Sequence, residues 1–279
     1  MGTPRLAPAR LAGHDGGPLR VDVRSGAKPG EARPAIVICH GFKGFKDWGF
    51  FPRAADRLAL AGFTAVSFNF SGSGVGEDGE SFDELERWGR QTITGDLADL
   101  AVVADYVAEL GAPWIGLLGH SRGGATALLH AARDHRVKAL VTWAAVCRYL
   151  WWSEEDIERW RRDGRLDVVN QRTGQVLPVR LDLLDDLEAN GGGTLDVLGA
   201  ASRLHTPWLI VHGAADESVS TDHARRLSVA SRSGGGRSEL LLVEGTGHTF
   251  GVRHPWAGSN ADFDHVLSRT VEFFSAALS

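Results

Sequence analysis

The sequence has few cysteines, no familiar metal-binding motif and no long apolar run. Only two of its 279 residues are cysteines, Cys39 and Cys147, which is too few for a disulfide framework. It contains neither His-Glu-x-x-His nor Cys-x-x-Cys, so we expect no metal ion and no cofactor. No stretch is long and apolar enough to cross a membrane. Residues 1–20 lack the apolar centre of a signal peptide, so a cytoplasmic protein is expected.

A strong excess of one charge is also lacking. The chain has 30 Lys and Arg against 35 Asp and Glu, a net charge of −5. This balance argues against nucleic acid or an anionic membrane as the main partner. With 43% hydrophobic and 23% charged residues, the chain is typical of a globular protein large enough for one α/β domain. We therefore expect a small-molecule partner, and a homodimer is left open.

Short apolar runs alternate with amphipathic stretches along most of the chain. The runs are short and mostly apolar, and residues 35–39 (A-I-V-I-C) are apolar throughout, as expected for strands buried on both faces of a sheet. The predicted strands are 35–39, 64–68, 114–118, 139–143, 208–212 and, after a loop, 239–243; the main predicted helices are 51–60, 93–110, 125–132 and 262–278. The alternating residues Leu19 to Val23 predict an antiparallel edge strand. This order predicts a mostly parallel sheet with helices on both faces.

The alternation of predicted strands and helices is interrupted between residues 147 and 204. This block contains charged helical stretches at 154–162 and 181–188, and a hairpin around 168–179. It is too long for an ordinary connection, so it predicts a small cap inserted into a core made of 1–146 and 205–279. Residues Trp143, Trp151 and Trp152 stand near its start. They either line a substrate site or pack the cap onto the core, and the sequence favours neither.

The segment that organises the chain is Trp114 to His130. Between its apolar run and its Ala- and Leu-rich stretch lies Gly119-His120-Ser121-Arg122-Gly123, a G-x-S-x-G pattern with a predicted strand before it and a helix after it. That context is typical of a nucleophile elbow. A serine on such a tight turn needs small neighbours, which the two glycines supply. Ser121 is therefore the predicted nucleophile.

A serine nucleophile needs a base, and the base needs an orienting acid. On this type of fold the acid and then the histidine follow the serine along the chain. Asp216 follows the predicted strand 208–212, and His248 follows the strand 239–243. Both would lie at carboxyl ends of parallel strands, where ligands bind in such sheets. These two residues are the predicted acid and base, with Glu217 and Asp222 as rivals for the acid.

The other histidines have structural interpretations. His40 and His212 end strands and would hold loops together. His120 lies inside the serine's own turn, so it is expected to pack rather than act as the base. His223, His254 and His265 are expected at the surface.

Acyl transfer also requires donors for the developing oxyanion. One is the backbone N–H of the residue after the serine, Arg122, and the other should come from the loop after the strand 35–39. Phe42 occupies that place, so its N–H is the second predicted donor. The Arg122 side chain is expected to form a structural ion pair.

Four quoted segments together resemble the α/β-hydrolase superfamily. They are His40-Gly41-Phe42, Gly119 to Gly123, His212 to Val219 and Gly247-His248. The stretch from His40 to Phe70 is similar to bacterial enzymes of the dienelactone-hydrolase-like and cinnamoyl or feruloyl esterase-like group. The resemblance implies an eight-stranded, mostly parallel sheet and a serine esterase that acts through an acyl-enzyme. The tryptophans at the start of the insertion, if they line the site, favour small to medium esters, aromatic ones included.

The chain departs from the family in two places. True dienelactone hydrolases use cysteine where this chain has Ser121, and the His-Gly-Gly-Gly run of one esterase group is absent. An amidase or acyl-peptide hydrolase with the same triad, and a non-catalytic binding protein on this fold, are the alternative functions.

Overall fold

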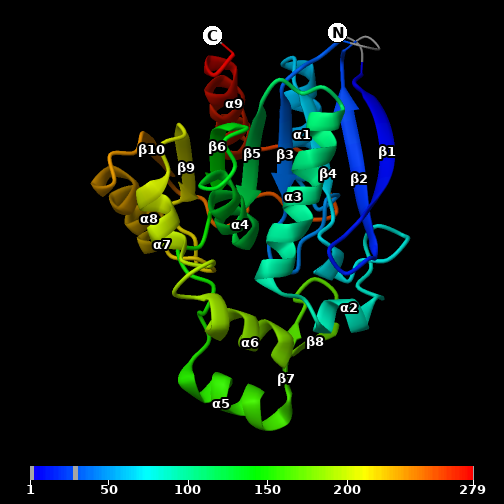
Figure 1. The fold of residues 1–279 in the computed structure, drawn as a ribbon, viewed down its shortest axis with the longest axis vertical. Helices are drawn as coiled ribbons and strands as arrows, with labels where there is room; N and C mark the ends of the chain where they lie inside the picture. Colours follow the sequence, from blue (N-terminus) through cyan, green and yellow to red (C-terminus); the bar gives the residue numbers. More distant parts are fainter. Residues whose placement is uncertain (1–2, 28–30, 279) are drawn as a thin grey trace.

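A sheet of eight strands runs through the core of the computed structural model, which describes residues 3–27 and 31–278 (Figure 1). The strand order is β1-β2-β4-β3-β5-β6-β9-β10. From β4 to β10 neighbouring strands are parallel, whereas β2 is antiparallel to both β1 and β4. Their bounds are β1 Arg5–Ala12, β2 Pro18–Ser25, β3 Ala35–Cys39, β4 Thr64–Phe68, β5 Ile115–His120, β6 Val137–Trp143, β9 Trp208–Gly213 and β10 Ser238–Val243. The predicted fold class is confirmed.

The N-terminal edge of the sheet differs from the prediction. Residues 19–23 belong to β2, but β2 is not an edge strand, because β1 pairs along its outer side. In β1 exposed and half-buried residues alternate, none of them is buried, and Pro8 lies in its middle. Its half-buried face consists of Ala7, Ala9 and Leu11, and with two alanines among the three its apolar alternation is weak.

Helices cover both faces of the sheet. On one face lie α1 (Phe51–Leu60) and α9 (Ala261–Ala276), and on the other α3 (Ile93–Glu109), α4 (Arg122–Ala131), α7 (Val197–Arg203) and α8 (Thr221–Ser233). Successive residues of β3 serve the two cores in turn: Ile36 packs with α1 and α9, Val37 with α3 and α4. This alternation explains why the strand is apolar at every position. A 3-10 turn, η1 (Ser71–Ser73), and the short α2 (Leu85–Gly89) follow β4.

Helix α8 occupies a segment that the sequence predicted to be a loop, so that prediction is wrong. Its buried positions are Ala224, Leu227, Ser228 and Ser231. Because half of them are serines, the buried stripe is small rather than apolar, and the helical period is hidden.

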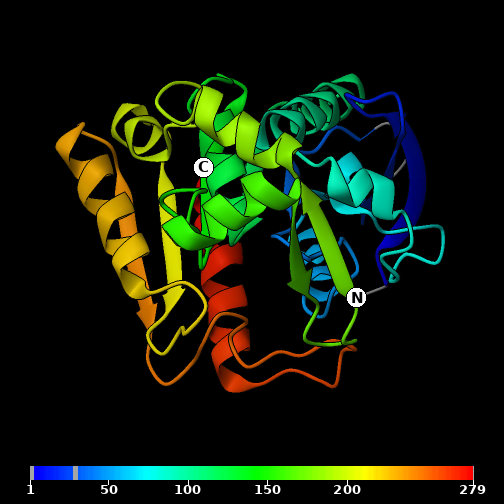
Figure 2. The same ribbon diagram turned by 90° about the horizontal axis from the view of Figure 1, so that it is seen from below.

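The cap consists of α5 (Glu154–Asp163), the hairpin β7 (Arg165–Val169) with β8 (Val176–Arg180), and α6 (Leu181–Asn190). In Figure 1 it lies below the core, and Figure 2, seen from that side, shows it across the middle of the molecule. Helix α7, although it belongs to the inserted segment, packs against α4 and α8. The end of the predicted insertion therefore lies with the core.

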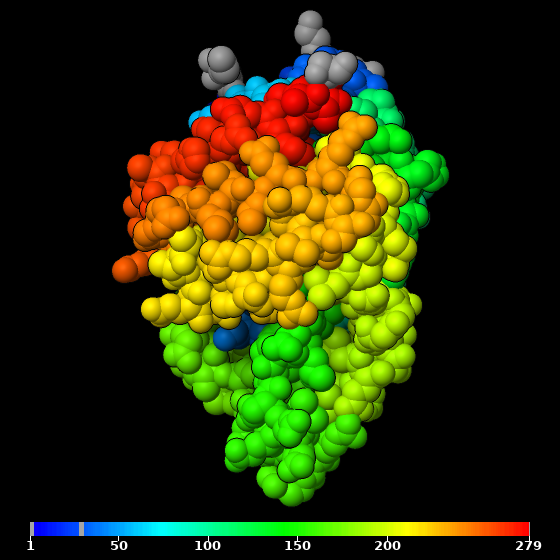
Figure 3. Space-filling model, turned by 90° about the vertical axis from the view of Figure 1, so that its left-hand side faces the viewer, coloured from blue at the N-terminus to red at the C-terminus, as the bar shows by residue number. Residues whose placement is uncertain are grey.

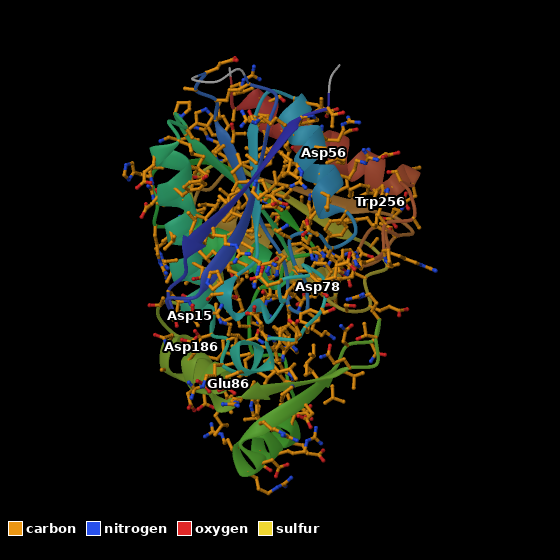
Figure 4. All side chains as sticks on the ribbon, turned by 90° about the vertical axis from the view of Figure 1, so that its right-hand side faces the viewer. Asp15, Asp56, Asp78, Glu86, Asp186 and Trp256 are labelled. Atoms are coloured by element: carbon orange, nitrogen blue, oxygen red, sulfur yellow. The ribbon has the colours of Figure 1, made fainter. Side chains whose placement is uncertain are left out.

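Hydrogen bonds join the cap firmly to the core. Asp186 of α6 accepts from the backbone N–H groups of Ile93 and Thr94, at 2.8 and 3.0 Å, and so caps the start of α3. Arg180, at the end of β8, pairs with Glu86 of α2. Figure 4 shows Asp186 and Glu86 near this junction. Among residues 3–27 and 31–278, no helix has the length and apolar character needed to cross a membrane.

Candidate active site

Ser121 occupies the turn between β5 and α4 with φ 56° and ψ −122°. A non-glycine residue at positive φ is strained by about 1–3 kcal/mol. The turn is held because the Ser121 N–H donates to the Trp143 carbonyl, 2.8 Å away. A Cβ at Gly119 would lie 2.4 Å from the Gly123 oxygen, and one at Gly123 would lie 2.2 Å from the His40 oxygen. Only glycine fits at either position, so the G-x-S-x-G pattern has a steric cause.

The His248 ring is oriented by a buried carboxylate. Its Nδ1 donates to Oδ2 of Asp216 at 2.7 Å, while Oδ1 accepts the backbone N–H groups of Ser218 and Val219, both at 2.9 Å. Nε2 of His212 lies 3.3 Å from Oδ2. Burial would raise the pKa of the Asp216 carboxyl, but hydrogen bonds from His212 and His248 outweigh it and hold this pKa well below its usual range. Asp216 is therefore ionised at neutral pH, and His248 Nε2 is left to accept a proton.

The loop after β9, which carries Asp216, packs closely against the loop after β10, which carries His248. A Cβ at Gly213 would meet the Gly247 oxygen at 2.4 Å. His120 Nε2 donates to the His248 carbonyl at 3.0 Å, and the two rings are 4.7 Å apart. Burial lowers the pKa of His120 to about 3, so this ring is neutral. His120 positions the His248 loop from within the serine's turn, in keeping with its expected packing role.

The rival carboxylates point elsewhere. Glu217 and Asp222 are exposed, and Asp222 lies 4.0 Å from Arg226. His40 is buried and its Nε2 accepts the Phe70 N–H at 3.2 Å, which is the structural role expected. Within the described ranges, no group of three His, Cys, Asp or Glu residues is placed to hold a metal ion.

Two histidines predicted at the surface are less exposed than expected. The His254 side chain is only 4% exposed and accepts the Gly49 N–H at 3.0 Å. His223 is half-buried. Its ring is held inside by the backbone of Cys147, a contact between distant segments that no local pattern could predict. His265 is exposed, as expected.

Ser121 and His248 share one cavity of about 420 Å³ between the core and the cap. Figure 3 shows a hollow at this boundary, between the yellow core surface and the green cap. Within the described part of the chain no hydrogen bond joins the Ser121 hydroxyl to the imidazole; such contacts often tighten only when substrate binds. The lining residues are Phe42, Lys43, Ser121, Val146, Trp151, Trp152, Val168, Val169, Ser218, Val219, His223 and His248.

The two predicted oxyanion donors lie beside the serine. Neither the Phe42 nor the Arg122 backbone N–H donates a hydrogen bond to any residue that the structure describes. Arg122 begins α4, so its N–H is one of the free donors at a helix start. A Cβ at Gly41 would lie 3.0 Å from Ser121 Cβ, which shows how closely the loop that carries Phe42 approaches the serine.

The Arg122 side chain is buried and forms the predicted ion pair. Its Nη2 lies 3.2 Å from Oδ2 of Asp96, and its Nη1 donates to Gln91 at 2.5 Å. The guanidinium also lies over the Phe42 ring, 5.1 Å from its centroid. The Arg122 side chain therefore connects the turn of Ser121 with the loop that carries Phe42, the two segments with the predicted donors.

The tryptophans divide between the cavity and the core. Trp151 and Trp152 line the cavity and stack on each other with ring centroids 4.4 Å apart. Trp143 does not line it, so its assignment as a substrate-binding residue is corrected. It is fully buried, and its Nε1 donates to Thr270 of α9 at 3.0 Å. Trp143 is two residues after Val141 in β6, so both side chains point to the same face of the sheet, the one covered by α1 and α9.

Several cavity residues were not predicted as part of the site. Val168 and Val169 were predicted only as part of a hairpin, and Lys43 as part of a polar loop. Lys43 Nζ donates to the Val169 carbonyl at 3.2 Å, joining the core loop to the cap hairpin. Their role depends on how the cap docks, and no local sequence pattern records that.

Comparison with known proteins identifies the family. The family model for the alpha/beta hydrolase fold matches residues 34–190, more than half of the chain. The 2,6-dihydropseudooxynicotine hydrolase of Paenarthrobacter nicotinovorans is 30% identical over 210 residues, which is 73% of this chain and 49% of that protein. The chain thus spans about half the length of this relative.

Solved structures share the fold over nearly the whole chain. Est1E from Butyrivibrio proteoclasticus, solved with ferulic acid bound, superposes with a TM-score of 0.74 at 21% identity, covering 96% of this chain and 98% of Est1E. The acylaminoacyl peptidase of Pyrococcus horikoshii gives a TM-score of 0.67 at 19% identity, covering 98% of this chain and 42% of the peptidase. On the matched family model, the sequence relative and the shared fold, this chain belongs to the α/β-hydrolase superfamily.

Proposed function

We propose that this protein is a serine hydrolase that cleaves small to medium carboxylic esters through an acyl-enzyme. The observation that carries the proposal is the 2.7 Å hydrogen bond from His248 to Asp216, beside a cavity that also contains Ser121 on a strained turn. Oriented imidazole, ionised acid and projecting hydroxyl are the three parts that nucleophilic acyl transfer requires.

In the first half-reaction Ser121 Oγ attacks the ester carbonyl carbon and gives its proton to His248 Nε2. The carbonyl oxygen becomes an oxyanion that accepts hydrogen bonds from the backbone N–H groups of Phe42 and Arg122. Asp216 stabilises the imidazolium through Nδ1. The tetrahedral intermediate then collapses: the bond to the alcohol oxygen breaks, the alcohol leaves with the proton from His248, and the acyl group stays on Ser121.

In the second half-reaction water attacks the acyl-enzyme. His248 takes a proton from the water, a second oxyanion forms between the same two N–H groups, and Ser121 leaves with the proton returned by His248. The carboxylic acid is released and the enzyme is restored. No cofactor takes part.

The cavity walls favour an aromatic or medium-length acyl chain. Phe42 and the stacked Trp151–Trp152 pair supply flat apolar surface, with ring centroids 6.0 and 6.4 Å from Phe42. A volume of about 420 Å³ suits a small aromatic ester. The complex of Est1E with ferulic acid supports hydroxycinnamoyl esters as the first substrates to assay.

The test is covalent labelling with a fluorophosphonate together with turnover of nitrophenyl esters. Ser121→Ala should lose both while keeping its circular dichroism spectrum. Ser218→Ala, which removes another hydroxyl of the cavity wall, should still be labelled. Turnover by Ser121→Ala would refute the mechanism, absence of labelling in the native chain would favour a binding protein, and faster turnover of matched anilides than of esters would favour an amidase.

A further inference from the structure

His223 stands on the cavity wall but has no part in the triad. It belongs to the first turn of α8, and its ring is half-buried. Nδ1 lies 2.9 Å from the backbone nitrogen of Cys147, just after β6. The neighbouring residue in that segment, Val146, also lines the cavity, so the ring is fixed against one wall of the site.

The Cys147 contact fixes the tautomer of the ring. A backbone N–H can only donate, so Nδ1 must be the acceptor. In a neutral imidazole the proton is then on Nε2, which makes that atom a donor. Burial, followed by the positive charge of Arg148, lowers the pKa of His223. The ring is therefore neutral at pH 7, with a single N–H.

That N–H is not used within the part of the chain that the structure describes. Nε2 of His223 has no hydrogen-bond partner among the described residues, yet it is not one of the polar atoms sealed away from solvent. The ring lines the cavity, and its Nδ1 is bound to the backbone of the wall at Cys147. We infer that the other ring nitrogen, Nε2, faces the space where a substrate binds. Val146 and Val219 supply apolar surface to the same wall, and Ser218 is a polar member of it. When a ligand fills the cavity, the Nε2–H group loses contact with water, so a ligand with an oxygen that accepts its hydrogen bond should bind more tightly than one without.

We propose that His223 is a specificity-determining residue whose Nε2–H donates to a second oxygen of the substrate, one outside the ester group. This inference rests on the proposed function, since it concerns the same cavity. The substrate class is narrowed to esters that carry an additional ether, hydroxyl or carbonyl oxygen. An apolar group at that place would exclude water from the donor and leave it unpaired, which should lower kcat/KM for such a substrate about tenfold.

The test compares isosteric pairs of esters that differ by one oxygen. On the acyl side the pair is methyl 4-methoxycinnamate and methyl 4-ethylcinnamate; on the alcohol side it is 2-methoxyethyl butyrate and butyl butyrate. We expect one pair to show a preference of about tenfold for the oxygen-bearing ester. Equal kcat/KM values within both pairs would overturn the proposal.

Two variants separate the donor from the structural contact. In His223→Asn the side-chain oxygen can still accept from Cys147, but no donor reaches the position of Nε2; the preference should fall to about one. In His223→Gln the amide nitrogen reaches that position, so part of the preference should return. A purely structural role would lower kcat/KM for both members of a pair by the same factor, and such a result would refute the proposal.

A spectroscopic readout keeps this inference distinct from the proposed function. In the Ser121→Ala variant, nitrogen NMR of the histidine side chains at pH 7.5 should show His223 as the neutral Nε2–H form, assigned with the His223→Asn variant. Its Nε2 signal should shift when the favoured oxygen-bearing ester binds, and shift less with its isostere. An Nδ1–H or charged ring, or equal shifts, would overturn the inference even if the esters are turned over. If no ester is turned over, the proposed function fails while this measurement still decides the role of His223.

Discussion

Gly41→Ala tests whether the loop after β3 supplies an oxyanion donor. The added Cβ would lie 3.0 Å from Ser121 Cβ and 3.1 Å from the His120 carbonyl oxygen. Carbon atoms pack at about 3.5 Å or more, and neither neighbour is the end of a flexible side chain. The loop that carries Phe42 must therefore retreat by about 0.5 Å.

The size of the effect follows from that retreat. An oxyanion donor works at about 2.7–3.1 Å, so a shift of about half an ångström takes the Phe42 N–H out of range. Loss of one such donor raises the barrier by about 3 kcal/mol, which corresponds to a fall in kcat of about 100-fold. Substrate affinity should change far less, because this contact forms only as charge develops on the oxygen.

The assay is the kcat for a nitrophenyl ester, together with the affinity for a trifluoromethyl ketone that forms an oxyanion adduct. Both should fall by a similar factor. Gly192→Ala is the matched control, because a Cβ there meets no atom within 4 Å. If Gly41→Ala folds and keeps its kcat to within about threefold, Phe42 is not a donor and the reasoning fails.

Three further changes test the acid, the buried histidine and the apolar wall. Asp216→Asn should lower kcat about 10⁴-fold by removing the ionised acceptor that orients His248; a loss below about tenfold in the same ester assay would contradict that role. Burial holds the pKa of His120 at about 3, against 6.5 for an ordinary histidine, so its contribution to stability is present above pH 6.5 and is lost as the pH falls toward 3. It should account for about 2 kcal/mol of the stability lost between pH 7 and 5, and urea unfolding of His120→Gln should show a pH difference smaller by that amount, whereas an unchanged difference would rule this out. Trp151→Ala removes the stacking partner of Trp152 and should raise KM for aryl esters about fivefold, with a smaller effect on acetate esters; equal effects on both would argue against an aromatic pocket.

The elements that the sequence predicted best are those with the plainest burial. The bounds predicted for β3, α1 and β4 agree with the structure residue by residue. The strands are buried on nearly every side chain, and α1 has Pro52 in its first turn and Gly62 just after its end. Strand β1 was missed because its inward face is only half-buried and mostly alanine, and α8 because half of its buried positions are serines.

Residues of the candidate site whose positions follow from the order of strands along the chain could be predicted. Residues whose positions depend on how α8 and the cap pack onto the core could not. Ser121, Asp216 and His248 each follow a strand, and parallel strands bring their carboxyl ends to one edge of the sheet. The place of His223 depends on the contact of α8 with the segment after β6, and that of Val168 on the docking of the cap. Trp143 is close to the cap in sequence, which suggested a place in the cavity. Side chains alternate between the two faces of β6, however, and Trp143 lies on the same face as Val141, toward α1 and α9.

The support of Ser121 reaches through the sheet to the end of the chain. The carbonyl that accepts the Ser121 N–H belongs to Trp143, whose indole is tied to Thr270 on the opposite face. Helix α9 thus supports the turn of Ser121 through the buried side chain of Trp143. A stop codon or a protease cut that removed α9 would be expected to disable the enzyme even though the cavity wall contains no residue of that helix.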